Sequence, residues 1–501
     1  MASRGPRPAQ LFQRSRNIAL ADRTVGVVAR DDQGIMEGYV LYSAGTMTYL
    51  IDSDGGVVHE WESSYVVFAA YLLENGHLIR DGNENIDAPI FRLGGAAGRV
   101  EEVDWDGTVL WTFSCEPLHA YISHHALQIL PNGNCLMLVW ERKTKEEAIL
   151  AGRRPDLLPD GEMLSEIVLE LKPDVDNGTA TVAWRWNLWD HLVQDFDASK
   201  ENYGDIAASP HRLDINCCPT GGKPGQRDQI QLDPRLSKAH GDNGPTGKTG
   251  EKDWCHINSV AYCPQRDQIA LSFNVHGEIM LVDHSTTTEE ASTSEGGQRG
   301  KGGDILLRFG NPKNYRRGTR LDQLLFCQHD VSFIPQGVPG AGHLLVFNNG
   351  RKPDRLWSTV DEYKLPEDTL WSGDYLAPQK ISQPVGPQAP CWRFGPSQFR
   401  LGSFYCTNIS GARRLENGNT IVNQGPLGIF IEVDAQGREV WRYVCPAVTC
   451  RPLTKGAITF VRQGDFPPED APRHFFIVNK YPVGYAAFQG KALEAYRYVE
   501  A

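Results

Sequence analysis

The chain has 501 residues, of which 41% are hydrophobic, 22% charged and 10% aromatic, with 50 Gly, 31 Pro and 12 Trp. Its formal net charge of −12 argues against nucleic acid or an anionic membrane surface as the main partner. No window approaches the roughly 18 apolar residues of a membrane-spanning helix. The high Gly and Pro content favours many turns and short strands over long helices.

The N-terminal segment is basic, with five arginines and a single acid in residues 1–23. It lacks the apolar stretch of a secretory signal, so we expect a disordered tail over 1–23 and a cytoplasmic protein; the alternative is a weak organelle transit peptide. The 11 cysteines show no CxxC spacing and are expected to be reduced. In an oxidising compartment, the pairs to consider are Cys391 with Cys406 and Cys445 with Cys450.

From residue 24 onward one phrase recurs: an apolar strand, an Asn-Gly turn and a second apolar strand. Asn-Gly between alternating apolar residues is the strongest local hairpin signal, because both turn residues tolerate positive φ. The phrase reads LLENGHLI (72–79), ILPNGNCLM (129–137) and RLENGNTIV (414–422).

A second phrase places an Asp-Gly-like turn shortly before a tryptophan. It reads IDSDGGVVHEW (51–61), VDWDGTVLW (103–111), VDAQGREVW (433–441) and, more loosely, NGTATVAW (177–184). Two hairpins per period predict a four-stranded antiparallel blade, and repeated blades predict a β-propeller. A β-sandwich is the alternative all-β fold.

Polar residues share one position of this repeat, six residues before the proline of the hairpin turn. His125 and His329 occupy it in HALQILPNG and HDVSFIPQG. Asn258 occupies it in a third strand, and His256 lies two residues earlier, on the same face. We therefore expect these side chains to begin the inner strands of different blades and to meet in the central channel, where Ser410 joins them.

A fifth aligned strand begins at Phe68, and the interval between His125 and Asn258 leaves room for a sixth. The sequence thus predicts an all-β, six-bladed β-propeller in one domain over 24–501. The N-terminal YVLY or the C-terminal HFFIVNKY segment is expected to close the ring. Segments near 190–252 and 284–303 are rich in Gly, Pro, Ser and Thr, and are predicted to be long loops inserted on the propeller faces.

Three imidazoles at one place can hold a metal ion, or they can divide the roles of nucleophile, proton donor and anion binder. His124 and His276 add ligand candidates. The nearby carboxylates are Asp253 and Asp330. Since Asp330 follows His329 directly in a strand, it points to the opposite face and is not expected to orient that histidine.

In these residues the sequence resembles the arylsulfotransferase family, whose members transfer sulfuryl groups without a nucleotide donor. The matching phrases cover most of residues 24–485. They are GYVLYSAGTMTYLIDSDGGVVHEW, HHALQILPNGN, DWCHINSVAYCPQRDQIALS, QHDVSFIPQG with HLLVFNNG, and SGARRLENGNTIVNQGPLGIFIEVDAQGREVW.

The resemblance implies a six-bladed propeller and a ping-pong transfer from an aryl sulfate to a phenol, with no cofactor and no nucleic acid or membrane partner. The family's nucleophilic histidine falls on His329. Its sulfuryl-binding and leaving-group histidines fall on His125 and His256, and its asparagine of HxNS falls on Asn258. Neutral imidazole attacks sulfur to give an N-sulfohistidine, while protonated partners neutralise the sulfuryl oxygens and the departing phenolate.

The sequence departs from the family in two ways. Asn274 stands where the family has an arginine that clamps sulfate, and His276 follows two residues later. The better-known members are exported and carry an extra N-terminal β domain, features that we do not find here. We expect Asn258, Asn274, His276, Ser410 and His124 to bind substrate.

Two alternatives remain open. One is a metal-dependent propeller enzyme, a hydrolase or oxygenase that holds iron, zinc or calcium with the central histidines. The other is a propeller without catalysis that serves as an interaction platform through the loops near 190–252 and 284–303.

Overall fold

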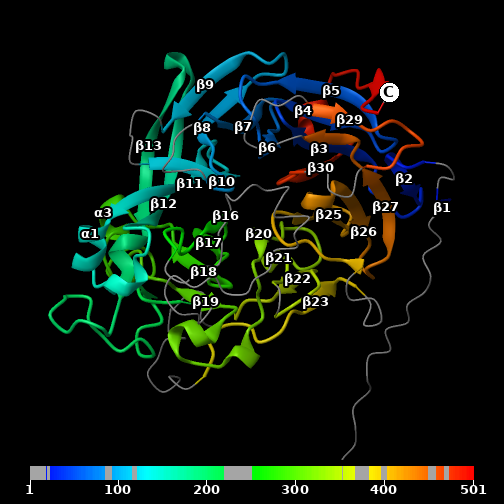
Figure 1. The fold of residues 1–501 in the computed structure, drawn as a ribbon. Coiled ribbons are helices and arrows are strands. Elements are labelled where there is room, and N and C mark those ends of the chain that lie inside the picture. The colour runs from blue at the N-terminus through cyan, green and yellow to red at the C-terminus, as the bar shows by residue number, and fades with distance from the viewer. Residues whose placement is uncertain are drawn as a thin grey trace, which may run out of the picture.

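The computed structural model describes residues 18–19, 23–84, 93–115, 121–218, 251–351, 354–366, 383–396, 403–449, 458–467 and 473–500. β-Strands dominate these residues, whose α-helices are the short α1 (Lys145–Leu150) and α3 (Thr288–Ala291). Figure 1 shows the sheets in a propeller-like arrangement, with β10, β16 and β20 toward the middle and β13, β19 and β23 toward the outside. The all-β prediction is confirmed.

Four-stranded antiparallel meanders repeat along the chain. Two of them are separate sheets, β16 (Ile257–Cys263), β17 (Gln268–Phe273), β18 (Glu278–Asp283) and β19 (Leu307–Phe309), and β20 (His329–Phe333), β21 (Leu344–Asn348), β22 (Thr359–Tyr363) and β23 (Trp392–Phe394). A third, β24 (Gly411–Arg414), β25 (Thr420–Gln424), β26 (Ile429–Val433) and β27 (Glu439–Val444), is extended at its outer edge by β2 (Gly26–Arg30) and β1 (Ile18–Ala19).

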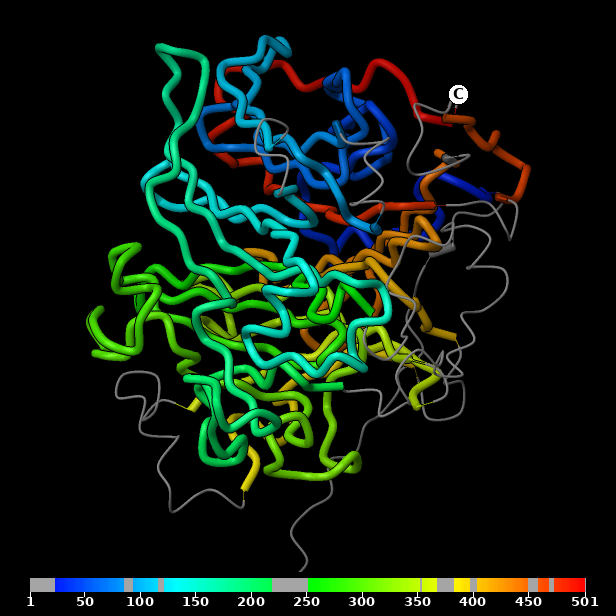
Figure 2. The backbone as a smooth tube through the Cα atoms, turned by 60° about the vertical axis from the view of Figure 1, so that its left-hand side comes forward, coloured from blue at the N-terminus to red at the C-terminus, as the bar shows by residue number. Residues whose placement is uncertain are grey.

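Two further meanders share one eight-stranded sheet. They are β6 (Ala70–Leu72), β7 (Leu78–Asn83), β8 (Gly98–Val103) and β9 (Val109–Ser114), and β10 (Tyr121–Ile129), β11 (Cys135–Thr144), β12 (Glu162–Asp174) and β13 (Thr179–Asn187). They are joined by a single parallel pairing, Thr179 with Thr112, where the long β12–β13 hairpin reaches β9. Figure 2 shows this hairpin extending beyond its neighbours.

The two ends of the chain meet in the remaining large sheet. Strand β30 (Val478–Pro482) pairs antiparallel with β3 (Gly38–Ala44), which continues into β4 (Met47–Ile51), β5 (Gly56–Glu62) and β31 (Arg497–Tyr498). The YVLY and HFFIVNKY segments, which were expected as alternatives for closing the ring, thus both take part by pairing with each other. The described residues form five hydrogen-bonded sheets of four or more strands. The count of six blades therefore stays a prediction.

The Asn-Gly hairpins form where they were predicted, between β6 and β7, β10 and β11, and β24 and β25. Their conformation differs in one respect from the expectation that both turn residues take positive φ. Only the glycines Gly76, Gly133 and Gly418 do so, at φ of 86–88°. The asparagine stabilises the turn instead by accepting a hydrogen bond from the backbone two residues on, as Asn75 does from the amide of His77 at 2.9 Å.

Three of the four tryptophans of the second phrase connect neighbouring meanders. Trp61 donates to the carbonyl of Asp104 at 3.2 Å, Trp184 to the hydroxyl of Thr286 at 3.2 Å, and Trp441 to the carbonyl of Ser53 at 2.9 Å. The fourth, Trp111, donates to Glu102 within its own meander. A buried indole contributes a large apolar area and satisfies its N–H at the same time, so the three connecting tryptophans fix their meanders against the next.

The insertions and tail carry more structure than predicted. Ile18–Ala19, inside the expected tail, form β1 against β2. The 190–252 insertion contains the parallel pair β14 (Leu192–Val193) and β15 (Leu213–Asp214), and the 284–303 insertion contains α3, capped by Thr287. A separate hairpin comprises β28 (Ala447–Thr449) and β29 (Ile458–Phe460).

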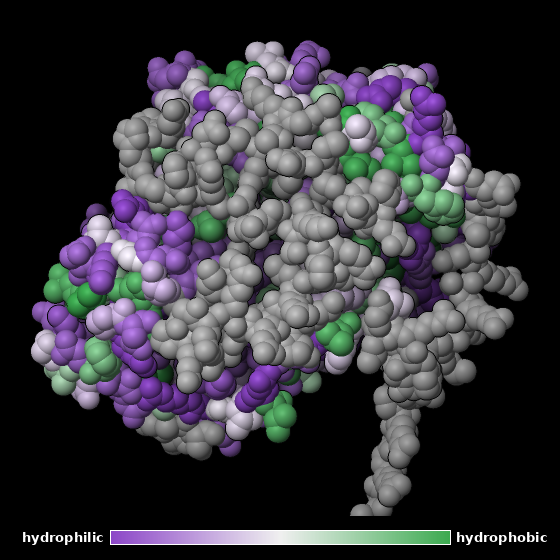
Figure 3. Space-filling model, in the orientation of Figure 1, coloured by the Kyte–Doolittle hydropathy of each residue, from purple (hydrophilic) through white to green (hydrophobic). Residues whose placement is uncertain are grey.

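The described cysteines are free, so Cys391 and Cys406 do not pair, whereas Cys450 lies outside the described residues. Among the described helices, none has the length and apolar composition needed to cross a membrane. Figure 3 shows mostly hydrophilic residues over the α1 and α3 side of the molecule.

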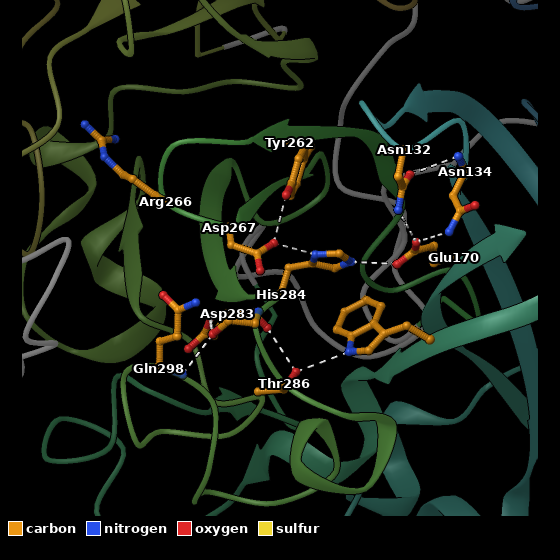
Figure 4. Close-up of polar contacts among 12 residues, drawn as sticks. Asn132, Asn134, Glu170, Tyr262, Arg266, Asp267, Asp283, His284, Thr286 and Gln298 are labelled. Atoms are coloured by element: carbon orange, nitrogen blue, oxygen red, sulfur yellow. Dashed lines mark hydrogen bonds and ion pairs between the residues drawn. The ribbon is translucent and has the colours of Figure 1, made fainter.

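A glutamate recurs in several meanders, at the end of the meander opposite to the start of its inner strand. We call these residues the third-strand glutamates. They are Glu102, Glu170, Glu362 and Glu432, and they lie on β8, β12, β22 and β26. Each is hydrogen-bonded to the residue that follows the hairpin turn of its own meander: His77, Asn134, His343 and Asn419. Figure 4 shows the arrangement at Glu170, which also receives Asn132 and His284.

Candidate active site

His256 directly precedes β16 and His329 begins β20, whereas His125 lies within β10, and each of these strands contains a bulge close to its histidine. The pairing of β10, β16 and β20 with their neighbours shifts register within the first residues. His125 and His256 adopt the left-handed backbone conformation, with φ of 59° and 49°. This conformation costs a non-glycine residue about 1–2 kcal/mol, and bulges of this kind redirect side chains next to functional sites.

The three histidines converge from three sheets. The rings of His125 and His256 are in contact, with centroids 4.6 Å apart and planes at 87°. Phe476, just before β30, lies against His125 and His329 with centroid distances of 5.5 and 6.4 Å. All four side chains are buried. The strand contacts β10–β16 and β16–β20 bring these strand starts side by side.

His329 is held in one tautomer. Its Nδ1 lies 3.0 Å from the carbonyl oxygen of Cys327 and 2.8 Å from Oδ1 of Asn349. Asn349 is itself oriented, because its Nδ2 donates to the carbonyl of Ile409 at 2.8 Å. Both partners of Nδ1 are acceptors, so the proton is on Nδ1 and Nε2 keeps its lone pair.

His329 is also neutral. Burial, with a smaller contribution from the charge of the nearby His256, lowers the pKa of its imidazole to about 3, although the hydrogen bonds to Asn349 and Cys327 oppose the shift. A neutral imidazole with a free Nε2 is a nucleophile over the whole physiological pH range.

His256 is in the opposite state. Its Nδ1 lies 2.6 Å from Oδ2 of the buried Asp253. Burial alone would lower the pKa of this imidazole, but the charge and hydrogen bond of Asp253 raise it above its ordinary value. His256 therefore favours the protonated form, and Asp253 holds its orientation.

A second chain of hydrogen bonds reaches His125 through His124. Nδ1 of His124 lies 2.8 Å from Nδ1 of His125, and Nε2 of His124 lies 3.0 Å from Oε2 of Glu166. Burial, reinforced by the charge of Asp253, raises the pKa of Glu166 well above its usual range. With Glu166 protonated, the carboxyl would donate to His124 and His124 to His125, which would leave the proton of the His125 ring on Nε2.

Gly95 leaves room for the His125 ring. Its backbone has φ of 88°, and a Cβ there would lie 2.3–2.6 Å from three atoms of the imidazole. The amide of His125 donates to the carbonyl of Gly95 at 2.8 Å. A side chain at residue 95 would therefore displace the imidazole.

The two predicted substrate-binding asparagines meet on one carbonyl. Nδ2 of Asn258 and Nδ2 of Asn274 donate to the carbonyl oxygen of Gln328 at 2.8 and 3.1 Å. Because Gln328 directly precedes His329, both amides position the start of β20. The Oδ1 atom of Asn258 is buried without a hydrogen-bond partner in the described structure.

The remaining predicted residues lie apart from the three histidines. The hydroxyl of Ser410 donates to the carbonyl of Asn408 and accepts from the amide of Gly425, at 3.2 and 3.1 Å. The ring of His276 packs against Trp254 and Phe273, where burial lowers its pKa to about 3. Among the described residues, no hydrogen bond or ring contact joins either residue to the histidine cluster.

Asp330 behaves as the strand geometry predicted. Its carboxylate accepts the amide of Ala412 at 2.9 Å and forms an ion pair with Arg413 at 2.5 Å, both on β24. It therefore connects two sheets and does not orient His329.

Sequence reasoning missed three residues of the site. Asn349 lies in the VFNNG phrase, which is a usable signal because an amide next to a strand end can orient a histidine. Phe476 lies in the ring-closing HFFIVNKY segment. Glu166 lies between Ser165 and Ile167 on β12. Nothing in this pattern distinguishes it from the other glutamates of the same strand.

The comparisons with known proteins agree with the residues that carry the resemblance. The family model described as Arylsulfotransferase (ASST) matches residues 27–444. The chain therefore belongs to the arylsulfotransferase family. No curated protein matches the chain.

Among solved structures, a protein of unknown function from Bacteroides caccae is 10% identical, with a TM-score of 0.39, over 81% of this chain and 93% of that one. A functionally unknown protein from Desulfotomaculum acetoxidans is 8% identical, with a TM-score of 0.34, over 85% and 99%. The Dos1 propeller is 10% identical, with a TM-score of 0.31, over 82% and 71%.

Proposed function

We propose that the protein transfers a sulfuryl group from an aryl sulfate to a phenol through an N-sulfohistidine on His329. The observation that carries this proposal is the pairing of a neutral nucleophile with a protonated neighbour. His329 has its Nδ1 proton fixed by two acceptors and its Nε2 free, while Asp253 keeps His256 protonated. We also propose that the eight-stranded sheet is two blades joined at their rim, which makes six blades in one domain over 24–501.

In the first half-reaction, the Nε2 lone pair of His329 attacks the sulfur of the ester. A nitrogen–sulfur bond forms and the sulfur–oxygen bond to the aryl group breaks. His256 gives its proton to the departing phenolate oxygen, so a neutral phenol leaves. His125 donates its Nε2 proton in a hydrogen bond to the sulfuryl oxygens, where charge is greatest in the transition state.

In the second half-reaction, a phenol acceptor takes the place of the first product. Its hydroxyl proton passes to His256, its oxygen attacks sulfur, and the nitrogen–sulfur bond breaks. His329 then returns to its starting state. The same proton carrier serves both halves, so the cycle consumes no proton and needs no cofactor.

The one positive charge among these groups is the imidazolium of His256, because asparagine replaces the family's arginine at residue 274. The proposal therefore places binding and leaving-group protonation on a single titrating group. Activity is expected between the pKa of His329, about 3, and the raised pKa of His256.

The test is intact mass after incubation with 4-nitrophenyl sulfate in the absence of acceptor. We expect one added sulfuryl group, mapped to His329 by peptide mass spectrometry and discharged by a phenol. A protein that gains no such group while releasing 4-nitrophenolate would overturn the proposal. Bound iron, zinc or calcium at the central histidines, without an adduct, would favour the metal-dependent alternative.

A further inference from the structure

The third-strand glutamates are equivalent in the repeat but differ in what surrounds them. Glu102 is bonded to His77 and to the indole of Trp111, both at 2.6 Å. Glu432 is bonded to Asn419 at 2.6 Å and Lys480 at 2.7 Å. Glu170 is surrounded by Asn132, Asn134 and His284 (Figure 4). At these three positions the described side-chain hydrogen bonds to the carboxylate come from histidine, tryptophan, asparagine and lysine, and none comes from a cysteine.

Glu362 differs because a thiol and an imidazole share the same carboxylate oxygen. Oε1 of Glu362 lies 2.7 Å from Nδ1 of His343 and 3.5 Å from Sγ of Cys391. The Sγ to Nδ1 distance is 3.7 Å. Within the described residues, this is the group of three His, Cys, Asp or Glu side chains whose ligand atoms all lie within 4.8 Å of one another.

These distances match a metal site. Tetrahedral zinc has bonds of about 2.3 Å to sulfur and about 2.0–2.1 Å to nitrogen and oxygen, which puts sulfur about 3.5 Å from the other two ligands and these about 3.3 Å from each other. The distances from Sγ of Cys391, 3.5 Å to Oε1 of Glu362 and 3.7 Å to Nδ1 of His343, are already close to this value. Only the nitrogen–oxygen pair must open, by about half an ångström, as a metal replaces their hydrogen bond.

The surroundings suit a site with an open position. Cys391 is exposed and His343 is half-buried, so solvent reaches the triangle of ligands, whereas Glu362 is buried. Oε2 of Glu362 is held at 2.6 Å by Arg414, whose side chain is 4% exposed. This outer ion pair orients Oε1 toward the other two ligands, and it lowers affinity through the charge of the guanidinium.

We propose that Nδ1 of His343, Oε1 of Glu362 and Sγ of Cys391 bind one Zn²⁺, with a water as the fourth ligand. Sulfur, imidazole and carboxylate together are the donors of zinc and not of magnesium or calcium. On binding, the thiol of Cys391 loses its proton to solvent. The imidazole proton moves from Nδ1 to Nε2, so one proton is released in total.

The experiment uses the full chain, stripped of metal with a chelator and titrated with Co²⁺ and then Zn²⁺. We expect one equivalent of Co²⁺ to give thiolate-to-cobalt charge-transfer absorption and tetrahedral visible bands, which Zn²⁺ removes. Zn²⁺ should also protect Cys391 from iodoacetamide, as read by peptide mass mapping. Cys391→Ser and His343→Ala should each weaken Zn²⁺ binding by at least about 100-fold, measured against a chromophoric chelator.

The repeat supplies the matched controls. His77→Ala removes an equivalent histidine that has no cysteine beside its glutamate, and Cys218→Ser removes another partly exposed thiol. Both should leave the absorption and affinity unchanged. The proposal is overturned if folded Cys391→Ser retains the charge-transfer band, or if wild-type Cys391 is alkylated equally fast with and without Zn²⁺. Binding by the central histidines alone would lack the sulfur band.

Discussion

Opposite ends of two neighbouring sheets hold histidines under opposite control. His329 begins β20 and is neutral, with a pKa of about 3. His284 follows β18 at the other end of the strands, where it lies 2.7 Å from Asp267 and 2.9 Å from Glu170. Burial favours the neutral ring, but the hydrogen bonds to these carboxylates raise the pKa of His284 to about 9.

The difference shows that partners, more than burial, decide what a histidine does. The ring of His329 is oriented by a carbonyl and an amide, so it stays uncharged and reactive. His284 is fixed between two carboxylates on different sheets, so it is charged and structural (Figure 4). His329 is buried and His284 is more exposed, and the type of acceptor around each ring differs as well.

The two ends also respond oppositely to pH. The folded pKa of His284 is raised, so its contribution to stability is fully present below about pH 6.5 and is lost as pH rises through about 9. The folded pKa of His329 is lowered, so the unfolded chain takes up a proton first, and stability falls as pH drops from about 6.5 toward 3.

The largest effect is expected from His329→Ala. Without the nucleophile, transfer from 4-nitrophenyl sulfate to phenol should fall by at least about 10³-fold, because the covalent route is removed. Initial rates at saturating donor measure this. His77→Ala, at the opposite end of its meander, should keep its rate within about twofold. An alanine variant at residue 329 with full activity would contradict the assignment.

Asp253→Asn should lower the rate at pH 7 by about 100-fold, because His256 then loses the charge that keeps it protonated. The alkaline limb of the pH–rate profile should move to lower pH, while the acidic limb, set by His329, stays in place. A profile from pH 5 to 9 measures the alkaline limb, and a separate acid series down to about pH 3 measures the acidic limb. A lower rate with an unmoved alkaline limb would show that Asp253 only supports the fold.

His284→Gln should destabilise the protein by about 2 kcal/mol, because Asp267 and Glu170 lose the charge between them in a half-buried setting. Urea unfolding at pH 6.5 measures this, and the difference from wild type should shrink as pH approaches 9. The transfer rate per folded molecule should not change. A loss of rate without a loss of stability would mean that the two ends are coupled.

The smallest effect concerns Asn274→Arg. A guanidinium restores a permanent charge for the sulfate ester, so the KM for 4-nitrophenyl sulfate should fall about tenfold, and activity should extend to higher pH. The variant gives up the hydrogen bond to Gln328, and Asn274→Gln serves as the uncharged control. An arginine variant with no gain over glutamine would show that residue 274 acts only through β20.

Much of the fold is local and was therefore predictable. Asn-Gly turns, alternating apolar residues and the tryptophan phrase each depend on neighbours within ten residues, and hairpins formed at 72–79, 129–137 and 414–422 as expected. The position shared by His125 and His329 was found by counting from the turn. The count succeeded although both bulges lie within the counted segments and that of β10 is longer than that of β20.

The sequence by itself determined the repeated hairpins, the family and the histidines worth examining, because these follow from short-range pattern and composition. Only the tertiary structure decided which histidine is neutral and which is charged. That outcome depends on Asn349, Asp253 and Glu166, which lie 20, 3 and 42 residues from their partners. It depends equally on burial among several sheets. Neighbouring groups and burial both shift the pKa of a histidine, and neither can be read from the alternation of residues along a strand.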